Sequence, residues 1–343
     1  MYRTSVYPNP KPFLMRRLVP SGRITVLFLV LILSFSHSVS NAQSVTLANG
    51  RLEVGAGIGP LFFLGDLGGN KGQGKRFVKD VNFPLVNMAK GVFAQYYIKE
   101  WLGVRVAANI GRIEGDDSQI REGKGDEQAR RDRNLNFRSN IKEAYLAFEI
   151  SPTVFLERYD GLLGKIRPYG IAGVGVFNFN PQGRYYHADG SFEWVDLKPL
   201  RTEGQGMKEY PTRKEYKLTQ VEIPVGVGVK YYISDNLFFG VEVMHRKTFT
   251  DYIDDVSTDY IDANLFANYM SPEQAAMANQ MHWRYNFVPG GTQTRVAVVG
   301  EQRGNPKQTD AFFSTILRMG WRFNDILSSD RMAMRQSRCP SFY

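Results

Sequence analysis

Hydrophobic and polar residues alternate along eight segments of the chain, and the breaks between these segments are alternately long and short. In one segment Val221, Val225 and Val229 share one face, while Glu222 and Lys230 share the other. Successive side chains of a β-strand point to opposite faces, so an alternation with period two predicts a strand. An apolar face opposite a face that carries charge is typical of strands in a transmembrane β-barrel.

We therefore predict an all-β protein, an eight-stranded antiparallel transmembrane β-barrel with short periplasmic turns and four long external loops. Its strands are expected at 51–59, 88–98, 102–111, 141–154, 167–178, 216–232, 237–246 and 310–323. The segment 167–178 has Gly and Ala in both phases, so its outward face stays undecided. Near the short turns, Tyr96, Tyr97, Tyr231 and Tyr232 suit the aromatic girdle that such barrels place at the membrane interface.

The N-terminal residues resemble a secretory signal. An apolar run, Ile24–Phe35, follows arginines at 16, 17 and 23 and precedes the small residues Ser40 and Ala42. Such a run is too short to span a membrane as a helix. We expect a signal peptide at 1–42 (with Met15 as an alternative start), the barrel at 43–323 and a short basic tail at 324–343.

Composition narrows the classes of partner. Cys339 is the only cysteine, so the chain can form no intrachain disulfide and no thiolate metal site. The formal net charge is +9, yet no nucleic-acid-binding module is recognisable, and we expect no nucleic-acid partner. In an outer membrane the nearest dense anions are lipopolysaccharide phosphates or an acidic patch on a partner. A solvated basic surface explains the charge equally well.

The inward faces of the predicted strands carry carboxylates and cations in nearly equal number. The interior of an eight-stranded barrel is just wide enough to be filled by its own side chains, and an unpaired buried charge is costly. We therefore predict a lumen charge network that neutralises itself, with Glu242 and Arg318 as one pair. Its members are Glu53, Arg105, Glu143, Glu149, Glu222, Lys230, Glu242, Arg318 and Arg322.

The sequence gives only weak indications of a catalytic site or a metal site. His245 lies in the lipid-facing phase of its strand, and nothing in the sequence indicates the Ser–His–acid group that a lipid-modifying enzyme requires. We expect no enzymatic activity, no catalytic residue and no cofactor. Asp251, Asp254 and Asp255 offer the oxygen ligands that calcium prefers, but the spacing and glycine of an EF-hand are missing. A solvated acidic loop is favoured over a calcium site.

Several segments have distinctive sequences that resemble those of a known family. These segments are Gly111–Asp117, Arg133–Ser139, Pro168–Phe177, Thr202–Gly206 and Arg246–Ser257. Together they resemble the PorG-type outer-membrane barrels associated with the type IX secretion system. The resemblance covers about 52–262 and the last strand, and it does not extend to the methionine-rich residues 270–281.

The resemblance implies a non-enzymatic part of a secretion machine in the outer membrane of a Gram-negative cell. The implied partners are periplasmic ring proteins resembling PorK and PorN, which would touch the turn at 158–165 or the tail. The wider family contains barrels with no known secretion role, so a second hypothesis stays open. In it the chain is a stand-alone surface barrel that binds lipopolysaccharide or envelope and host partners through its external loops. A third hypothesis, a small pore, conflicts with a filled interior.

Overall fold

The computed structural model describes residues 52–68, 86–99, 101–120, 126–153, 165–234, 236–285, 287–291 and 295–323. The predicted signal peptide at 1–42, the start at Met15 and the basic tail at 324–343 lie outside these residues. Almost all of the predicted periplasmic turn at 158–165 lies outside them as well. No helix in the described part of the chain is long and apolar enough to cross a membrane.

Two groups of elements make up the described structure. The wall of the barrel consists of β1 (Leu52–Leu64), β2 (Asn87–Lys99), β3 (Leu102–Asp116), β4 (Asn136–Ile150), β5 (Ile166–Asn178), β8 (Thr219–Tyr232), β9 (Leu237–Thr248) and β10 (Ala311–Phe323). The long connections contain η3 (Asp117–Gln119), α2 (Asp126–Arg133), β6 (Pro181–Tyr186), β7 (Phe192–Asp196), η6 (Lys198–Leu200), η7 (Ala263–Leu265), α3 (Phe266–Tyr269) and α4 (Pro272–His282).

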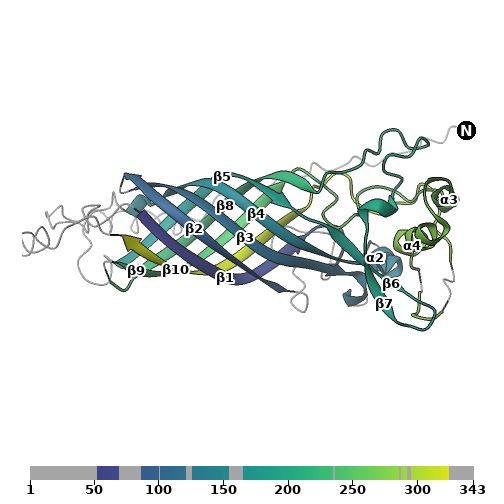
Figure 1. Ribbon diagram of the computed structural model, residues 1–343, viewed down its shortest axis with the longest axis horizontal. Helices are drawn as coiled ribbons and strands as arrows, with labels where there is room; N and C mark the ends of the chain where they lie inside the picture. Colours follow the sequence, from purple (N-terminus) through teal and green to yellow (C-terminus); the bar gives the residue numbers. More distant parts are fainter. Residues whose placement is uncertain are drawn as a thin grey trace, which may run out of the picture. The chain divides into compact units, whose positions relative to one another are not determined.

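The strands of the wall close on themselves. Each pairs antiparallel with the next in the chain, and β10 returns to pair with β1, where Phe323 lies opposite Leu52. Figure 1 shows the tilted strands wrapping around the barrel, with the short turns at its left-hand end. The predicted eight-stranded antiparallel barrel is confirmed.

Strands β3 and β4 extend further than the sequence indicates. β3 continues to Asp116 rather than 111, and β4 begins at Asn136 rather than 141, because these extra residues pair with one another. Their polar side chains hide the alternation, although Ile113 and Phe137 on the inward face are each only 1% exposed. This extension carries the sheet into the region of the long connections.

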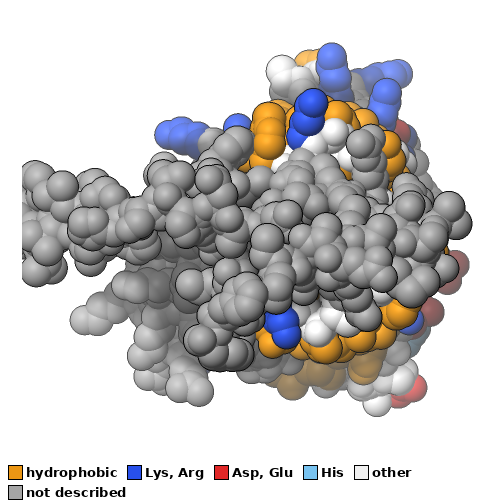
Figure 2. Space-filling model, turned by 90° about the vertical axis from the view of Figure 1, so that its left-hand side faces the viewer, with side chains coloured by type: hydrophobic (Ala, Val, Ile, Leu, Met, Phe, Trp, Pro, Cys, Tyr) orange, Lys and Arg blue, Asp and Glu red, His pale blue; other side chains and the backbone are white. Residues whose placement is uncertain are grey.

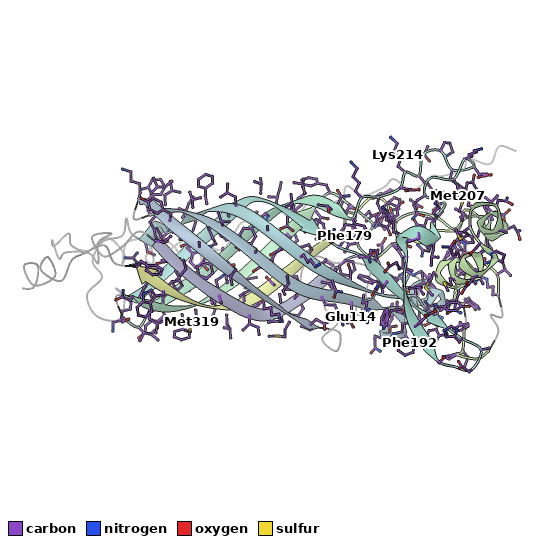
Figure 3. All side chains as sticks on the ribbon, viewed as in Figure 1. Glu114, Phe179, Phe192, Met207, Lys214 and Met319 are labelled. Atoms are coloured by element: carbon purple, nitrogen blue, oxygen red, sulfur yellow. The ribbon has the colours of Figure 1, made fainter. Side chains whose placement is uncertain are left out.

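The outward face is the apolar phase of each strand. Val227 on β8 is 65% exposed and Leu317 on β10 is 61% exposed, as expected of side chains that face lipid. Met319 projects from the wall in Figure 3, and Figure 2 shows hydrophobic side chains around the visible edge of the barrel. On β5, whose face the sequence left undecided, Val174 and Val176 face outward.

The girdle interpretation is wrong for two of the four tyrosines. Tyr96 and Tyr231 are exposed on the outer wall, whereas Tyr97 and Tyr232 are buried inside the barrel. Neighbouring residues on a strand face opposite sides, so an adjacent pair of tyrosines cannot both face the membrane. The inward pair instead joins the polar lumen described below.

The long connections pack together at the end of the barrel opposite the short turns (Figure 1). We call the described residues of 65–68, 117–135, 179–218 and 249–310 the external cap. Its hydrophobic core contains Leu135, Ile253, Val256, Phe266 and Ala278, and it is continuous with Phe312 at the barrel mouth. These external segments were predicted as loops, and their helices and the β6–β7 hairpin were not foreseen.

We expect the closed barrel to resist sodium dodecyl sulfate at room temperature, because strand pairing leaves few backbone groups for detergent to attack. The unheated protein should migrate differently from the boiled protein on a gel. An identical mobility before and after boiling, together with a helical far-UV spectrum, would contradict the barrel.

Candidate functional site

The lumen nearest the short turns holds a buried ionic layer that joins opposite walls. Lys230 Nζ on β8 lies 3.0 Å from Glu53 Oε2 on β1 and 2.6 Å from Glu149 Oε1 on β4. Arg322 Nη2 on β10 lies 2.7 Å from Glu53 Oε1. The Tyr97 hydroxyl contacts the same two carboxylates, at 3.2 and 3.1 Å. Five strands, β1, β2, β4, β8 and β10, are thereby tied together through the carboxylates of Glu53 and Glu149.

A second ionic layer lies around Arg105 on β3. Its guanidinium forms ion pairs with Glu149 and with Glu242 on β9, and all three side chains are fully buried. The predicted pair of Glu242 and Arg318 forms, with Arg318 Nη2 2.5 Å from Glu242 Oε1. The Tyr169 hydroxyl donates to Glu242 Oε2 at 2.8 Å. Every charge in this layer has an opposite charge or a hydroxyl beside it.

A third group lies nearer the external cap. Arg246 on β9 binds Glu143 on β4 with two hydrogen bonds, at 2.7 and 3.1 Å, and also donates to Ser314. Glu222 is fully buried beside Glu143, and no arginine, lysine or other donor among the described residues forms a hydrogen bond with its two carboxylate oxygens. The structure therefore brings eight of the nine predicted lumen residues into ion pairs and leaves Glu222 out.

Sequence reasoning missed Arg246, although a signal was present. Arg246 follows Glu242 by four residues on the same strand, so the two share the inward phase. The predicted strand ends at this residue, and the predicted lumen network does not include it. Its burial at 1% exposure shows that the inward phase continues to the end of β9.

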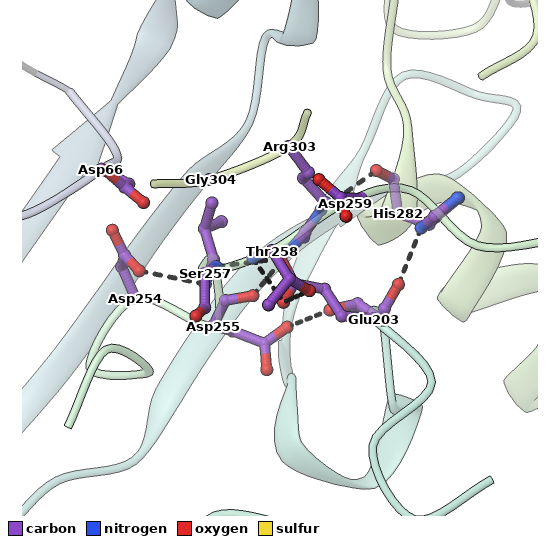
Figure 4. Close-up of polar contacts among 12 residues, drawn as sticks. Asp66, Glu203, Asp254, Asp255, Ser257, Thr258, Asp259, His282, Arg303 and Gly304 are labelled. Atoms are coloured by element: carbon purple, nitrogen blue, oxygen red, sulfur yellow. Dashed lines mark hydrogen bonds and ion pairs between the residues drawn. The ribbon is translucent and has the colours of Figure 1, made fainter. Parts of the chain in front are cut away.

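The external cap is organised around Glu203 (Figure 4). Glu203 Oε1 accepts from the backbone N–H of Ser257 at 2.9 Å and from Arg303 Nη1 at 2.8 Å. Its Oε2 accepts from the backbone N–H and the hydroxyl of Thr258, at 3.0 and 2.8 Å. One fully buried carboxylate thus holds the third long connection against two parts of the fourth.

Two buried arginines extend these links. Arg133 Nε lies 2.8 Å from Asp117 Oδ2, and its terminal nitrogens donate to the backbone carbonyls of Arg303 and Asp66. Arg303 also donates to the carbonyl of Asp255 at 2.7 Å. Burial and the Arg303 charge lower the pKa of His282 to about 3, so the neutral ring donates from Nδ1 to the Thr202 carbonyl oxygen at 2.7 Å. All four long connections are joined in this way.

The three aspartates that we considered for calcium do not converge on one point. Asp255 has a left-handed backbone conformation with φ of 65°, and its carboxylate accepts from Thr202 and Tyr216. Asp254 instead accepts from the backbone N–H groups of Leu67 and Val256. Within the described ranges, no group of three or more His, Cys, Asp and Glu side chains could hold a metal ion. Asp254 therefore fixes loop backbone, and Asp255 binds two side-chain hydroxyls.

Burial changes the protonation of these carboxyls. It raises the pKa of Asp251 to about 8. A hydrogen bond from Ser257 opposes this shift, and repulsion from Asp66 and Glu203 adds to it. It raises the pKa of Asp255 to about 6, although the Arg303 charge and hydrogen bonds oppose the shift. Burial also raises the pKa of Asp254 well above its usual range. The cap therefore retains protons that the unfolded chain would release at neutral pH.

The segments that carry the family resemblance meet in this buried region. Asp117 and Arg133 come from two of them and form an ion pair with each other. Glu203 and Ser257 come from two others and are joined by a hydrogen bond. These residues are at most 5% exposed, so their chemistry serves the packing of the cap. A partner that approaches from outside would not touch them.

The comparisons with known proteins agree with the strand pairing. The family model of the outer membrane protein beta-barrel domain matches residues 27–268. No curated protein matches the sequence.

Three solved structures illustrate the likeness. Ail, the attachment invasion locus protein of Yersinia pestis, is 9% identical with a TM-score of 0.33 and covers 80% of this chain and 99% of its own. OprG from Pseudomonas aeruginosa is 10% identical with a TM-score of 0.35, over 82% and 99% of the two chains. Neisserial surface protein A is 9% identical with a TM-score of 0.32, over 79% and 97%. At these identities and TM-scores the likeness provides no evidence about the fold beyond the strand pairing itself.

Replacing Lys230 by Met should destabilise the barrel by about 3–5 kcal/mol, because Glu53 and Glu149 each lose a buried cation. The measurement is the urea midpoint of the gel-mobility shift. Lys217→Met, at an exposed residue, is the matched control and should change stability by less than about 0.5 kcal/mol. Equal midpoints for the two variants would show that the lumen pairs contribute nothing.

The stability of the cap should fall as the pH rises from about 4 to about 8. In that window the unfolded chain releases protons near the ordinary aspartate pKa of about 4, while the folded cap still binds them. Asp251→Asn removes one such group, so its melting temperature at pH 8 should exceed that of the native protein by a few degrees and match it near pH 4. Tryptophan fluorescence during heating follows the change. Parallel pH profiles for the two proteins would refute this explanation.

Proposed function

The chain belongs to the outer membrane β-barrel domain family, and from its resemblance to the PorG-type barrels we propose that it is a non-enzymatic, non-conducting barrel of the type IX secretion system. In this proposal the barrel anchors or stabilises the periplasmic ring complex. The ring proteins that it contacts resemble PorK and PorN. In this role the protein is an anchor in the outer membrane rather than a channel through it.

The observation that carries the proposal is the plugged interior. Arg105, Glu149 and Glu242 are fully buried where a channel would run, and Lys230 is 1% exposed. Opening a path would separate these charges in a medium of low dielectric, at a cost of several kcal/mol for each ion. The same carboxylates accept hydrogen bonds from arginine and lysine, which leaves them poorly suited to act as catalytic bases.

The cap supports the resemblance to the PorG-type barrels. The matching segments supply Asp117, Arg133, Glu203 and Ser257 to the buried contacts between the long connections. Because the sequence segments that resemble the PorG-type barrels supply buried contacts, the resemblance favours a similar cap architecture in those barrels and in this chain. A similar cap architecture does not by itself name a partner, so the link to secretion rests on the resemblance.

Contacts with ring proteins would form at the end with the short turns. The residues described there include Trp101 between β2 and β3, Leu102 at the start of β3, and Ile233 and Ser234 after β8. The tail and nearly all of the turn at 158–165, which we consider the main contact regions, lie outside the described residues. Their contacts with the ring are therefore part of the proposal.

A second candidate function has one observation in its favour. Val296 is 79% exposed in the external cap, and Val288, Val298 and Val299 are each more than half exposed. Apolar side chains gathered at the outer end of the protein suit contact with another envelope or host molecule. In that case the chain would act as a stand-alone surface barrel.

Crosslinking in intact cells, followed by pull-down of a tagged copy, tests the two functions. The secretion proposal expects PorK-like and PorN-like proteins to be enriched about tenfold or more over an unrelated outer-membrane barrel carrying the same tag, as for a specific complex. A variant that lacks residues 324–343 should retain the barrel and recover less of the ring proteins.

The stand-alone hypothesis expects a different result. Surface molecules would be recovered without ring proteins, and mutation of the exposed valines to serine would reduce their recovery. Recovery of the ring proteins at the level of the unrelated barrel would overturn the secretion proposal.

A further inference from the structure

Cations in the outward phase of the barrel wall are concentrated on three adjacent strands. Lys90 on β2, Arg112 on β3, and Arg138 and Lys142 on β4 all belong to the outward phase of their strands. We call these four residues the basic patch. Lys90 and Lys142 are exposed, and the two arginines are half-buried.

Strand register places the basic patch at the edge of the apolar belt. Across five strands, Val92, Ala108, Ala144, Val176 and Val221 lie opposite one another in one apolar row. The adjacent outward row toward the cap contains Lys90, Ile110, Lys142, Asn178 and Thr219. The next outward positions on β3 and β4 are Arg112 and Asn140. Along β3 and β4, this change from apolar to polar and charged outward side chains is the one expected near the lipid headgroups.

The patch carries an excess of positive charge. Arg112 Nε donates to Asn140 Oδ1 and Arg138 Nε donates to Gln182 Oε1, each at 3.0 Å, and both acceptors are neutral. The ion pairs found among the described residues include none of the four cations. Like charges stand nearby, since Arg112 and Arg184 both repel the Arg138 guanidinium. The carboxylate of Glu114, opposite Arg138, offsets only one of these charges.

An aromatic ring completes the patch. Trp194 on β7 lies with its centroid 4.1 Å from the Arg138 guanidinium and 5.0 Å from that of Arg184. Arg184 is itself paired with Asp116 at 3.7 Å. In Figure 3, Glu114 lies where the barrel meets the cap, at the level that this register assigns to the patch. The stacked ring holds the Arg138 guanidinium in place beside the barrel wall.

The corresponding positions on the rest of the wall are mostly uncharged. Toward the cap, the outward residues include Phe62 on β1, Phe313 on β10 and Thr219 on β8. On β9 the outward phase ends at Lys247. A general preference for lysine and arginine at this level would distribute cations around the barrel. Their concentration on β2–β4 points to a localised anion.

We propose that the basic patch binds the phosphate groups of a glycolipid in the outer leaflet, of the lipopolysaccharide type. Its phosphates would lie against Arg112, Arg138 and Lys142, while its acyl chains lie on the apolar rows beneath them. A lipid fits better than a soluble anion because the cations belong to the lipid-facing phase directly above the hydrocarbon level. The inference needs only the outer-membrane location and does not depend on the role in secretion.

The test measures how much lipid A the purified full-length protein retains in detergent, by native mass spectrometry. The variant Arg112→Gln, Arg138→Gln, Lys142→Gln should retain at least about tenfold less bisphosphorylated lipid A, since each cation near an anionic headgroup contributes about fivefold. The matched control Lys208→Gln, Lys214→Gln, Lys217→Gln removes the same charge from exposed residues of the cap. It should stay within about twofold of the native protein, because distant exposed charges are screened.

Two further arms identify the ligand. Dephosphorylated lipid A should be retained no better by the native protein than by the patch variant, and inorganic phosphate at the lipid's concentration should not displace lipid A. The gel-mobility shift on boiling confirms that each variant is folded. The proposal fails if the patch and control variants lose lipid A equally, if dephosphorylated lipid A binds as well, or if inorganic phosphate displaces it.

Discussion

Every predicted lumen charge except Glu222 meets an opposite charge from another strand, and the rest of the barrel depends on this pairing. Arg105 on β3 reaches Glu242 on β9, and Lys230 on β8 reaches Glu53 on β1. A slip of one residue in β1, β3, β4, β8, β9 or β10 would turn its buried charged side chains toward lipid. Leaving one partner unpaired would cost several kcal/mol. The ion pairs therefore select one register and one closure of the sheet, which hydrophobic alternation alone would leave less sharply defined.

The external cap applies the same chemistry outside the membrane. Glu203 holds the backbone at Ser257 and Thr258, and Arg133 and Arg303 connect segments that are distant in the sequence. Because these groups are buried, each hydrogen bond that is lost would leave a polar atom without water. This explains how long connections rich in polar residues acquire a single conformation. It also explains why the segments that resemble the PorG-type barrels lie inside the cap.

The sequence predicted the barrel well because its signal is local. Period-two alternation marks the membrane-spanning part of each strand, and it assigned Glu242 and Arg318 to the inward face before any pairing was known. The cap was missed because Glu203 and Ser257 are 54 residues apart, and no local pattern connects them. A few signals were available, such as the capping box that Ser271 and Gln274 form at the start of α4. The divergence of Asp254 and Asp255 depends on one left-handed residue, which adjacent carboxylates in a sequence do not reveal.

The filled lumen has a consequence for the order of assembly. Once Arg105 and Lys230 have met their carboxylates, a polypeptide has no way through the barrel. All segments of the cap must therefore cross the membrane while the sheet is still open. Asp310, directly before β10, accepts a hydrogen bond from the backbone of Ile253 and so ties the arrival of the last strand to the folding of the longest connection. In this order of assembly the long connections cross the membrane first, and β10 then pairs with β1. The ion pairs of the lumen form last.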